Sequence, residues 1–183
     1  MTDCNVMLAN GHSPIPLPMA HPSSACVGLR LAIKRAQSGN ATPLARAACN
    51  MAGLTLFALT VGDGILAISP LPGGGGDYAS DLELLHEWRP SIVVSMTTEA
   101  EMEHLGASHL GHDVQEHGAR WMHLPIEDFG APTTAIEAKW LSVSRAALAA
   151  LRGGGRVLVH CRGGCGRSGM VALRLMIESG EAP

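Results

Sequence analysis

The chain has 183 residues, of which 46% are hydrophobic, and a formal net charge of −3. This length is typical of one domain with a sizeable core, and the weakly acidic balance argues against a nucleic-acid or anionic-membrane partner. Five cysteines without a recurring spacing favour a reducing compartment over a disulfide framework; because no apolar run is long enough to span a membrane, we expect a cytoplasmic protein.

The first fifty residues differ from the rest, because no acidic residue lies between Asp3 and Asp63. The stretch HSPIPLPMAHPSS is rich in proline and serine and should resist regular structure. The stretch CVGLRLAIKRAQSGN could form a short basic amphipathic helix that ends at Gly39. We therefore expect residues 1–50 to be an N-terminal extension that is poorly ordered or partly helical, followed by a domain over residues 51–183.

From residue 54 onward, apolar runs alternate with amphipathic stretches. Strands are expected at residues 54–61, 64–69, 91–96, 120–125 and 156–161. Helices are expected from Asp77, as N-cap, to residue 88, in a histidine-containing stretch that ends near residue 117, at residues 133–155 with a glycine stop, and from Ser168 onward. This order predicts an α/β fold with a central, mostly parallel mixed sheet and helices on both faces. Such sheets place their sites in loops after the strands.

The loop in HCRGGCGRSG (residues 160–169) joins the last predicted strand to the last helix. Its glycines permit a tight ring, and successive backbone N–H groups in such a ring form an anion-binding nest. The following helix adds unsatisfied N–H groups and the positive end of its dipole. The candidate phosphate-binding residues are Arg162, Gly163, Gly164, Cys165, Gly166 and Arg167.

Cys161 lies at the start of this loop, where positive charge should lower the pKa of its thiol. Arg167 can return across the ring and bind two anion oxygens in bidentate fashion. A thiolate beneath a site for a tetrahedral oxyanion is a nucleophile for phosphoryl transfer. The alternative is a packing cysteine beside a glycine turn, which the strand–loop–helix setting disfavours.

The string HCRGGCGRSG resembles the signature of the cysteine-dependent protein tyrosine phosphatase superfamily, dual-specificity branch. HLPIEDFGAPT and SPLPG are similar to stretches of cyclin-dependent-kinase-associated phosphatases and their bacterial relatives, and the similarity runs from about Ile65 to Ser179. The resemblance implies that Cys161 forms a phosphocysteine, that Arg167 and the loop amides bind the phosphoryl oxygens, and that Ser168 donates a hydrogen bond toward the sulfur. The resemblance also implies that His160 organises the loop. The alternative is a strand histidine whose ring forms hydrogen bonds with backbone groups.

The leaving oxygen of a serine or threonine ester needs a proton. In the family, an aspartate on a mobile loop supplies it, and Asp128 in PIEDFGAP matches that position, with Glu127 as the alternative. Without the cysteine loop, Asp128 would be read as a solvated carboxylate beside Pro132. No cofactor or metal is implied.

Three further features have alternative interpretations. His104, His109, His112 and His117 crowd one stretch, but at helical spacing they point in different directions, so a solvated helix is favoured over a metal site. Cys165 could form a reversible disulfide with Cys161, although a small side chain behind the loop is preferred. Residues 97–99 follow a strand and either lie near the site or cap a helix that Glu99 and Glu101 favour.

Relatives in the family generally continue past the signature helix, whereas this chain stops at Pro183. The resemblance thus implies a domain that is short at its C-terminus, that pairs with another chain, or that residues 1–50 help to cover.

The leading functional prediction is a phosphoprotein phosphatase acting on phosphotyrosine and on phosphoserine and phosphothreonine. A phosphatase for phosphoinositides or other small phosphate esters is the first alternative; Arg162 is the only added cation in the loop, which disfavours it. A sulfur-transfer domain of the rhodanese type is disfavoured by Gly164, Ser168 and the separate Asp128 loop. A catalytically weak phosphate-binding module is the fourth interpretation.

Overall fold

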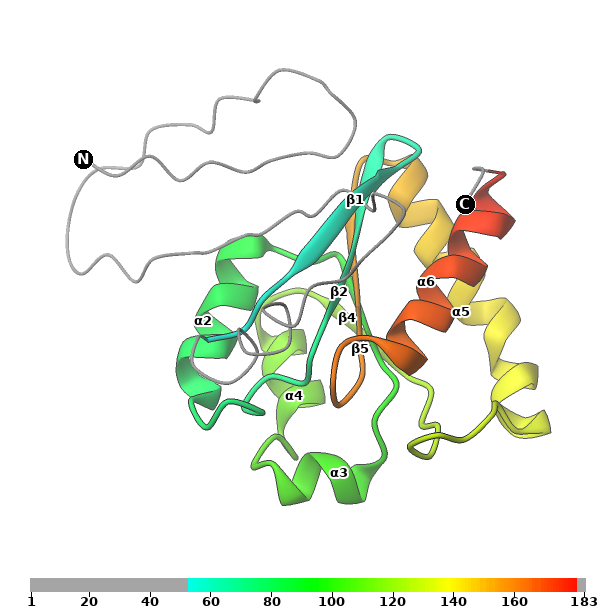
Figure 1. Cartoon of the computed structure of the whole chain (residues 1–183). Helices are drawn as coiled ribbons and strands as arrows, with labels where there is room; N and C mark the ends of the chain where they lie inside the picture. Colours follow the sequence, from blue (N-terminus) through cyan, green and yellow to red (C-terminus); the bar gives the residue numbers. More distant parts are fainter. Residues whose placement is uncertain (1–52, 181–183) are drawn as a thin grey trace, which may run out of the picture.

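The structure is a computed structural model and describes residues 53–180. The expectations for residues 1–50 lie outside the described residues. Within these residues, a five-stranded sheet has the order β1-β2-β5-β3-β4, with strands β1 (Phe57–Val61), β2 (Gly64–Ser69), β3 (Ile92–Ser95), β4 (Arg120–His123) and β5 (Arg156–His160). The helices are α2 (Tyr78–Trp88), α3 (Glu99–His104), α4 (Leu110–Glu116), α5 (Thr134–Arg152) and α6 (Gly166–Ser179). Figure 1 shows this arrangement.

The sheet is mixed, as the alternation of strands and helices predicts. β1 pairs with β2 in antiparallel fashion through a tight turn, and all other pairs are parallel. Ser69 at the end of β2 and Ser95 at the end of β3 both pair with His160 at the end of β5. The carboxyl ends of the three central strands therefore meet at one edge, which is where sites form in parallel sheets.

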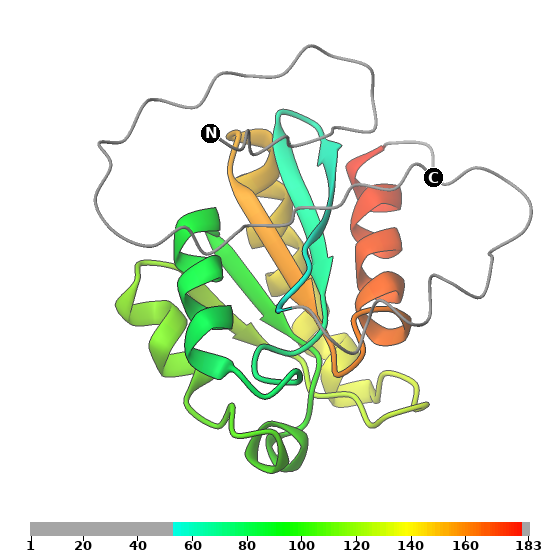
Figure 2. The ribbon, with the colours of Figure 1, turned by 60° about the vertical axis from the view of Figure 1, so that its left-hand side comes forward.

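Helices cover both faces of the sheet (Figures 1 and 2). α5 and α6 pack on one face, where Trp140 and Leu175 join a core with Val157 and Val159. α2 and α4 pack on the other face, where Trp88 joins a core with Leu158. Successive residues of β5 thus enter opposite cores, as the two-residue period of a strand requires, and the predicted fold class is confirmed.

Several predicted helix ends agree with the structure. Asp77 caps α2, as predicted, by accepting a hydrogen bond from the Ser80 N–H at 3.1 Å. Thr133, predicted as the first residue of its helix, instead caps α5 by accepting a hydrogen bond from the Ile136 N–H at 3.3 Å. α5 ends at the predicted glycine stop, Gly153. Within the described residues, no helix has the length and apolar character that crossing a membrane requires.

Several predicted boundaries were wrong; β4, for example, ends at His123 rather than at residue 125. β1 begins at Phe57 rather than at residue 54. The histidine-containing stretch forms two helices, because Gly106 adopts a φ of 70° and turns the chain between α3 and α4. α6 begins at Gly166 rather than at Ser168, so the last part of the signature loop is already the first turn of the helix.

Candidate active site

The loop between β5 and α6 holds Cys161 with its sulfur surrounded by hydrogen-bond donors. The side chain is 3% exposed, and the Ser168 hydroxyl lies 3.4 Å from Sγ. Burial raises the pKa of the Cys161 thiol, but hydrogen bonds from the Ser168 side chain and from the backbone N–H groups of Ser168, Cys165 and Gly164 outweigh it, so the pKa lies below its ordinary value. The loop thus favours a thiolate.

Gly164 allows this loop to lie tightly against the end of β2. Its φ is 73°, and a Cβ atom at this position would lie 2.4 Å from the Pro70 backbone nitrogen. Leu71 N–H donates to the Arg162 carbonyl at 3.3 Å, so the SPLPG segment and the signature loop form one packed unit. A side chain at residue 164 would separate the two segments.

Arg167 extends from the first turn of α6 and is 6% exposed. Its Nη1 and Nη2 atoms each donate to Glu101 at 2.7 Å, and Nη1 also donates to the Ile126 carbonyl at 2.6 Å. This bidentate pair fixes the plane of the guanidinium. The sequence pattern did not assign Glu101 to the site, because its capping-box position beside Thr98 explains it as a helix-start residue, a role that it also has.

Asp128 lies on the loop between β4 and α5. Its Oδ1 atom is 3.2 Å from Arg167 Nη2, and its side chain is 47% exposed. The loop and the signature segment line an open cavity of about 530 Å³. Asp128, Phe129, Cys161, Arg162, Arg167 and Met170 are among the residues that line this cavity. Glu127, the sequence alternative to Asp128, is not part of the lining.

His160 ends β5, directly before Cys161 in the sequence, and is fully buried. Its Nε2 atom is 2.6 Å from the Ser95 hydroxyl oxygen, and this oxygen accepts a hydrogen bond from Trp121 Nε1–H at 2.7 Å. Burial, together with the charges of His123 and Arg167, lowers the pKa of His160 to about 3, so the ring is neutral. Within the described part of the chain, the hydrogen-bond partner of the ring is a side chain, and the role of His160 in organising the loop stays a prediction.

The four histidines between residues 104 and 117 lie at different places on two helices. His104 ends α3, His109 and His117 flank α4, and His112 lies inside α4. Within the described residues, His112 is the one histidine whose ring is grouped with two carboxylates, those of Asp113 and Glu116, with ligand atoms within 4.8 Å of one another.

Loss of the Glu101 carboxylate should weaken the fold in a pH-dependent way. Hydrogen bonds from Arg167 lower the pKa of Glu101 from 4.5 to about 2, against the opposing effect of burial. A lowered folded-state pKa stabilises the fold above pH 4.5, and this contribution is lost as the pH falls toward 2. We expect Glu101→Gln to lower Tm at pH 7, and the Tm difference from wild type to shrink between pH 5 and 2.

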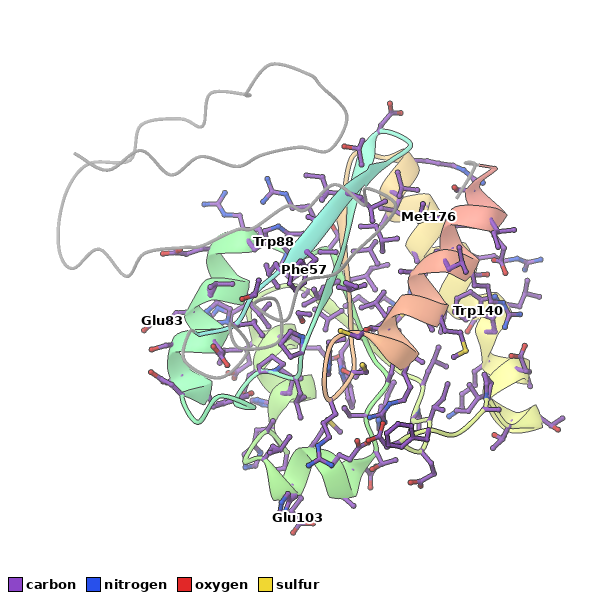
Figure 3. All side chains as sticks on the ribbon, in the orientation of Figure 1. Phe57, Glu83, Trp88, Glu103, Trp140 and Met176 are labelled. Atoms are coloured by element: carbon purple, nitrogen blue, oxygen red, sulfur yellow. The ribbon has the colours of Figure 1, made fainter. Side chains whose placement is uncertain are left out.

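Thermal unfolding across this pH range measures the effect. Glu103→Gln, on the exposed side of the same helix (Figure 3), is the matched control and should show no such pH-dependent difference. A Tm difference for Glu101→Gln that stays constant down to pH 2 would contradict the ion pair with Arg167.

Comparison with known proteins identifies the family. Residues 71–181 match a family model described as a polymorphic toxin system, DSP-PTPase phosphatase. No curated protein matches the chain. The structure of kinase associated phosphatase, with serine in place of its catalytic cysteine, is similar with a TM-score of 0.63 and 22% identity, over 71% of this chain and 76% of that chain.

Two other solved structures extend the comparison. Tk-PTP in its active form has a TM-score of 0.50 and 27% identity, over 62% of this chain and 68% of that chain. A DUF442 protein from Shewanella putrefaciens has a TM-score of 0.51 and 20% identity, over 79% and 80%. The resemblance inferred from HCRGGCGRSG is thereby confirmed: the chain belongs to the DSP-PTPase phosphatase family of polymorphic toxin systems.

Proposed function

We propose that this chain is a phosphoprotein phosphatase that hydrolyses phosphotyrosine, phosphoserine and phosphothreonine through a phosphocysteine at Cys161. The observation that carries the proposal is the arrangement of Ser168 and three backbone N–H groups around the Cys161 sulfur, which lowers the pKa of the thiol at the floor of a cavity that Arg167 also lines. A nucleophile with these neighbours suits phosphoryl transfer. Because the nucleophile must stay reduced, we place the activity in the cytoplasm.

In the first step, the Cys161 thiolate attacks phosphorus and the ester oxygen leaves. The S–P bond forms as the O–P bond breaks, and Asp128 gives its proton to the departing oxygen. Arg167 and the backbone N–H groups of residues 162–167 bind the three phosphoryl oxygens, which carry the charge of the transition state.

In the second step, water attacks the phosphocysteine. The Asp128 carboxylate accepts a proton from this water, the S–P bond breaks, and inorganic phosphate leaves with Cys161 again a thiolate. The hydroxyl of Ser168, 3.4 Å from Sγ, donates a hydrogen bond to the departing sulfur and so stabilises its charge.

The position of Asp128 fits a loop that moves when substrate binds. Glu101 and Ile126 already hold one edge of the Arg167 guanidinium, and Asp128 lies beside Nη2. A phosphoryl oxygen that binds Nη2 takes the place of the Asp128 carboxylate. Because Asp128 lines the same cavity, its displaced carboxyl group would stay close to the leaving oxygen of the substrate.

Two features favour a protein substrate of either ester type. The single tyrosine of the chain, Tyr78, bonds to Asp113 on the α2–α4 side of the sheet, so it forms no deep wall that would exclude phosphoserine. Exposed Glu99 and Glu103 flank Glu101 on α3, and Glu127 precedes Asp128; these carboxylates oppose the polyanionic headgroup of a phosphoinositide.

The test is hydrolysis in EDTA of matched phosphotyrosine, phosphothreonine and phosphoserine peptides, with p-nitrophenyl phosphate and a soluble inositol phosphate alongside. We expect turnover of all three peptides, and of the inositol phosphate at a far lower kcat/KM. Preference for the inositol phosphate would establish the small-molecule alternative. Phosphate binding without turnover of any ester would establish a binding module.

A further inference from the structure

A second cavity, of about 270 Å³, lies between the first halves of α5 and α6. Its walls are apolar side chains from the end of the sheet and from both helices, together with two charged residues, Glu137 and Arg174. Leu124, Ile136 and Val171 among these walls are at most 8% exposed, so the cavity reaches into the core. Figure 3 shows Trp140, another wall residue, beside α6.

This cavity adjoins the cavity above Cys161. Met170, which is 39% exposed, lines both cavities and lies one helical turn after Arg167. Ile126 and Pro132, which flank the Asp128 loop, line the second cavity. A ligand that fills the phosphate cavity can therefore extend past Met170 into the second one.

The charges at the second cavity neutralise each other. Arg174 Nη1 donates to both Glu137 oxygens at 2.8 and 2.9 Å, and its guanidinium lies 4.4 Å from the Trp140 ring centroid. Arg174 Nε also donates to Glu178 at 3.3 Å. Because the Arg174 cation is already paired, it is not free to bind a charged group of a ligand. The apolar walls can instead bury an apolar group.

We propose that this cavity is a side-chain pocket that binds one apolar side chain of the phosphoprotein substrate, close in sequence to the phosphorylated residue. The inference rests on the proposed function, because the phosphate must occupy the cavity above Cys161. The volume is sufficient for a side chain as large as leucine or phenylalanine, since a cavity of about 150 Å³ already holds a benzene ring.

Occupancy of the side-chain pocket also acts on the reaction site. The Ile126 carbonyl accepts a hydrogen bond from Arg167 Nη1 at 2.6 Å. A substrate side chain packed against Ile126 and Pro132 contacts both ends of the Asp128 loop. Binding energy from this remote group can then hold the loop in its working position, which raises kcat as well as lowering KM.

The experiment uses phosphoserine peptides that differ at one flanking position. Alanine, valine, leucine and phenylalanine are placed in turn at each of the two positions on either side of the phosphoserine, and kcat and KM are measured. At one position we expect kcat/KM to rise about tenfold from alanine to the best large side chain, as burial of an apolar side chain predicts.

Two variants that narrow the pocket give the sharper readout. In Val171→Leu, which adds one methylene, and in Ile136→Phe, the preferred side chain should become smaller and the tenfold gain should disappear. Leu141→Ala and Leu173→Ala are the controls, because these exposed residues lie on the same helices but do not line the pocket. Both should keep the wild-type preference.

Each outcome is decisive. Equal kcat/KM for all flanking residues, in an enzyme that hydrolyses the alanine peptide, overturns the pocket and leaves the proposed function intact. An unchanged preference in folded Val171→Leu also overturns it. If p-nitrophenyl phosphate is hydrolysed but no peptide is, the protein-substrate assignment and the pocket fail together.

Discussion

Cys161→Ser is expected to abolish phosphatase turnover, with a loss in kcat on the order of 10⁴-fold or more, as for other enzymes that lose a covalent nucleophile. A serine hydroxyl ionises far less readily than a thiol, and the hydrogen bonds that lower the pKa of Cys161 cannot make up this difference at neutral pH. The loop amides and Arg167 remain, so the variant should still bind phosphate esters.

The measurement is p-nitrophenyl phosphate turnover in EDTA, together with the rise in Tm that inorganic vanadate causes. Retained stabilisation by vanadate shows that the phosphate cavity of Cys161→Ser is intact. If Cys161→Ser turned over substrate within tenfold of the wild-type rate, the Cys161 sulfur would not be the nucleophile, and the proposed mechanism would be contradicted.

Asp128→Asn should slow hydrolysis of a phosphoserine peptide by about 10²- to 10⁴-fold, the usual contribution of a general acid. The asparagine cannot supply the proton that the serine oxygen needs. Its effect on p-nitrophenyl phosphate should be smaller, because p-nitrophenol is a much stronger acid than a serine hydroxyl. In the pH dependence of kcat/KM for the peptide, the limb that requires a protonated acid should disappear.

Glu127→Gln is the matched control for this prediction. Glu127 is the neighbouring exposed carboxylate and does not line the cavity, so the variant should keep its dependence on leaving group and pH. If Glu127→Gln loses the pH limb of the protonated acid and Asp128→Asn keeps it, the general acid is Glu127 and not Asp128.

Much of this fold follows from local pattern. The apolar run before Cys161 and the glycines after it predict a strand, a loop and a helix in the order that the structure has. Asp77 occupies the cap position that a short polar side chain before an amphipathic run predicts, and α5 ends at the predicted glycine stop. These features depend on neighbours in sequence, which is why the sequence alone predicts them.

Features that depend on the order of strands were not predictable in this way. Glu101 and Arg167 are 66 residues apart, and they meet because β3 lies beside β5 in the sheet. Gly164 contacts Pro70 for a similar reason, since β2 lies on the other side of β5. The sequence alone shows Glu101 as a carboxylate at a helix start and Gly164 as a loop glycine. It does not show that Glu101 binds Arg167 or that Gly164 packs against Pro70.

The central claim is a covalent phosphocysteine at Cys161, and trapping it is the most direct test. Wild-type protein is mixed with p-nitrophenyl phosphate labelled on phosphorus, quenched in acid after a few milliseconds, digested, and its labelled peptide sequenced by mass spectrometry. We predict label on the peptide containing Cys161, formed as fast as p-nitrophenol appears and absent in Cys161→Ser. Label on another residue, or turnover with no labelled protein at any time, would contradict the two-step mechanism.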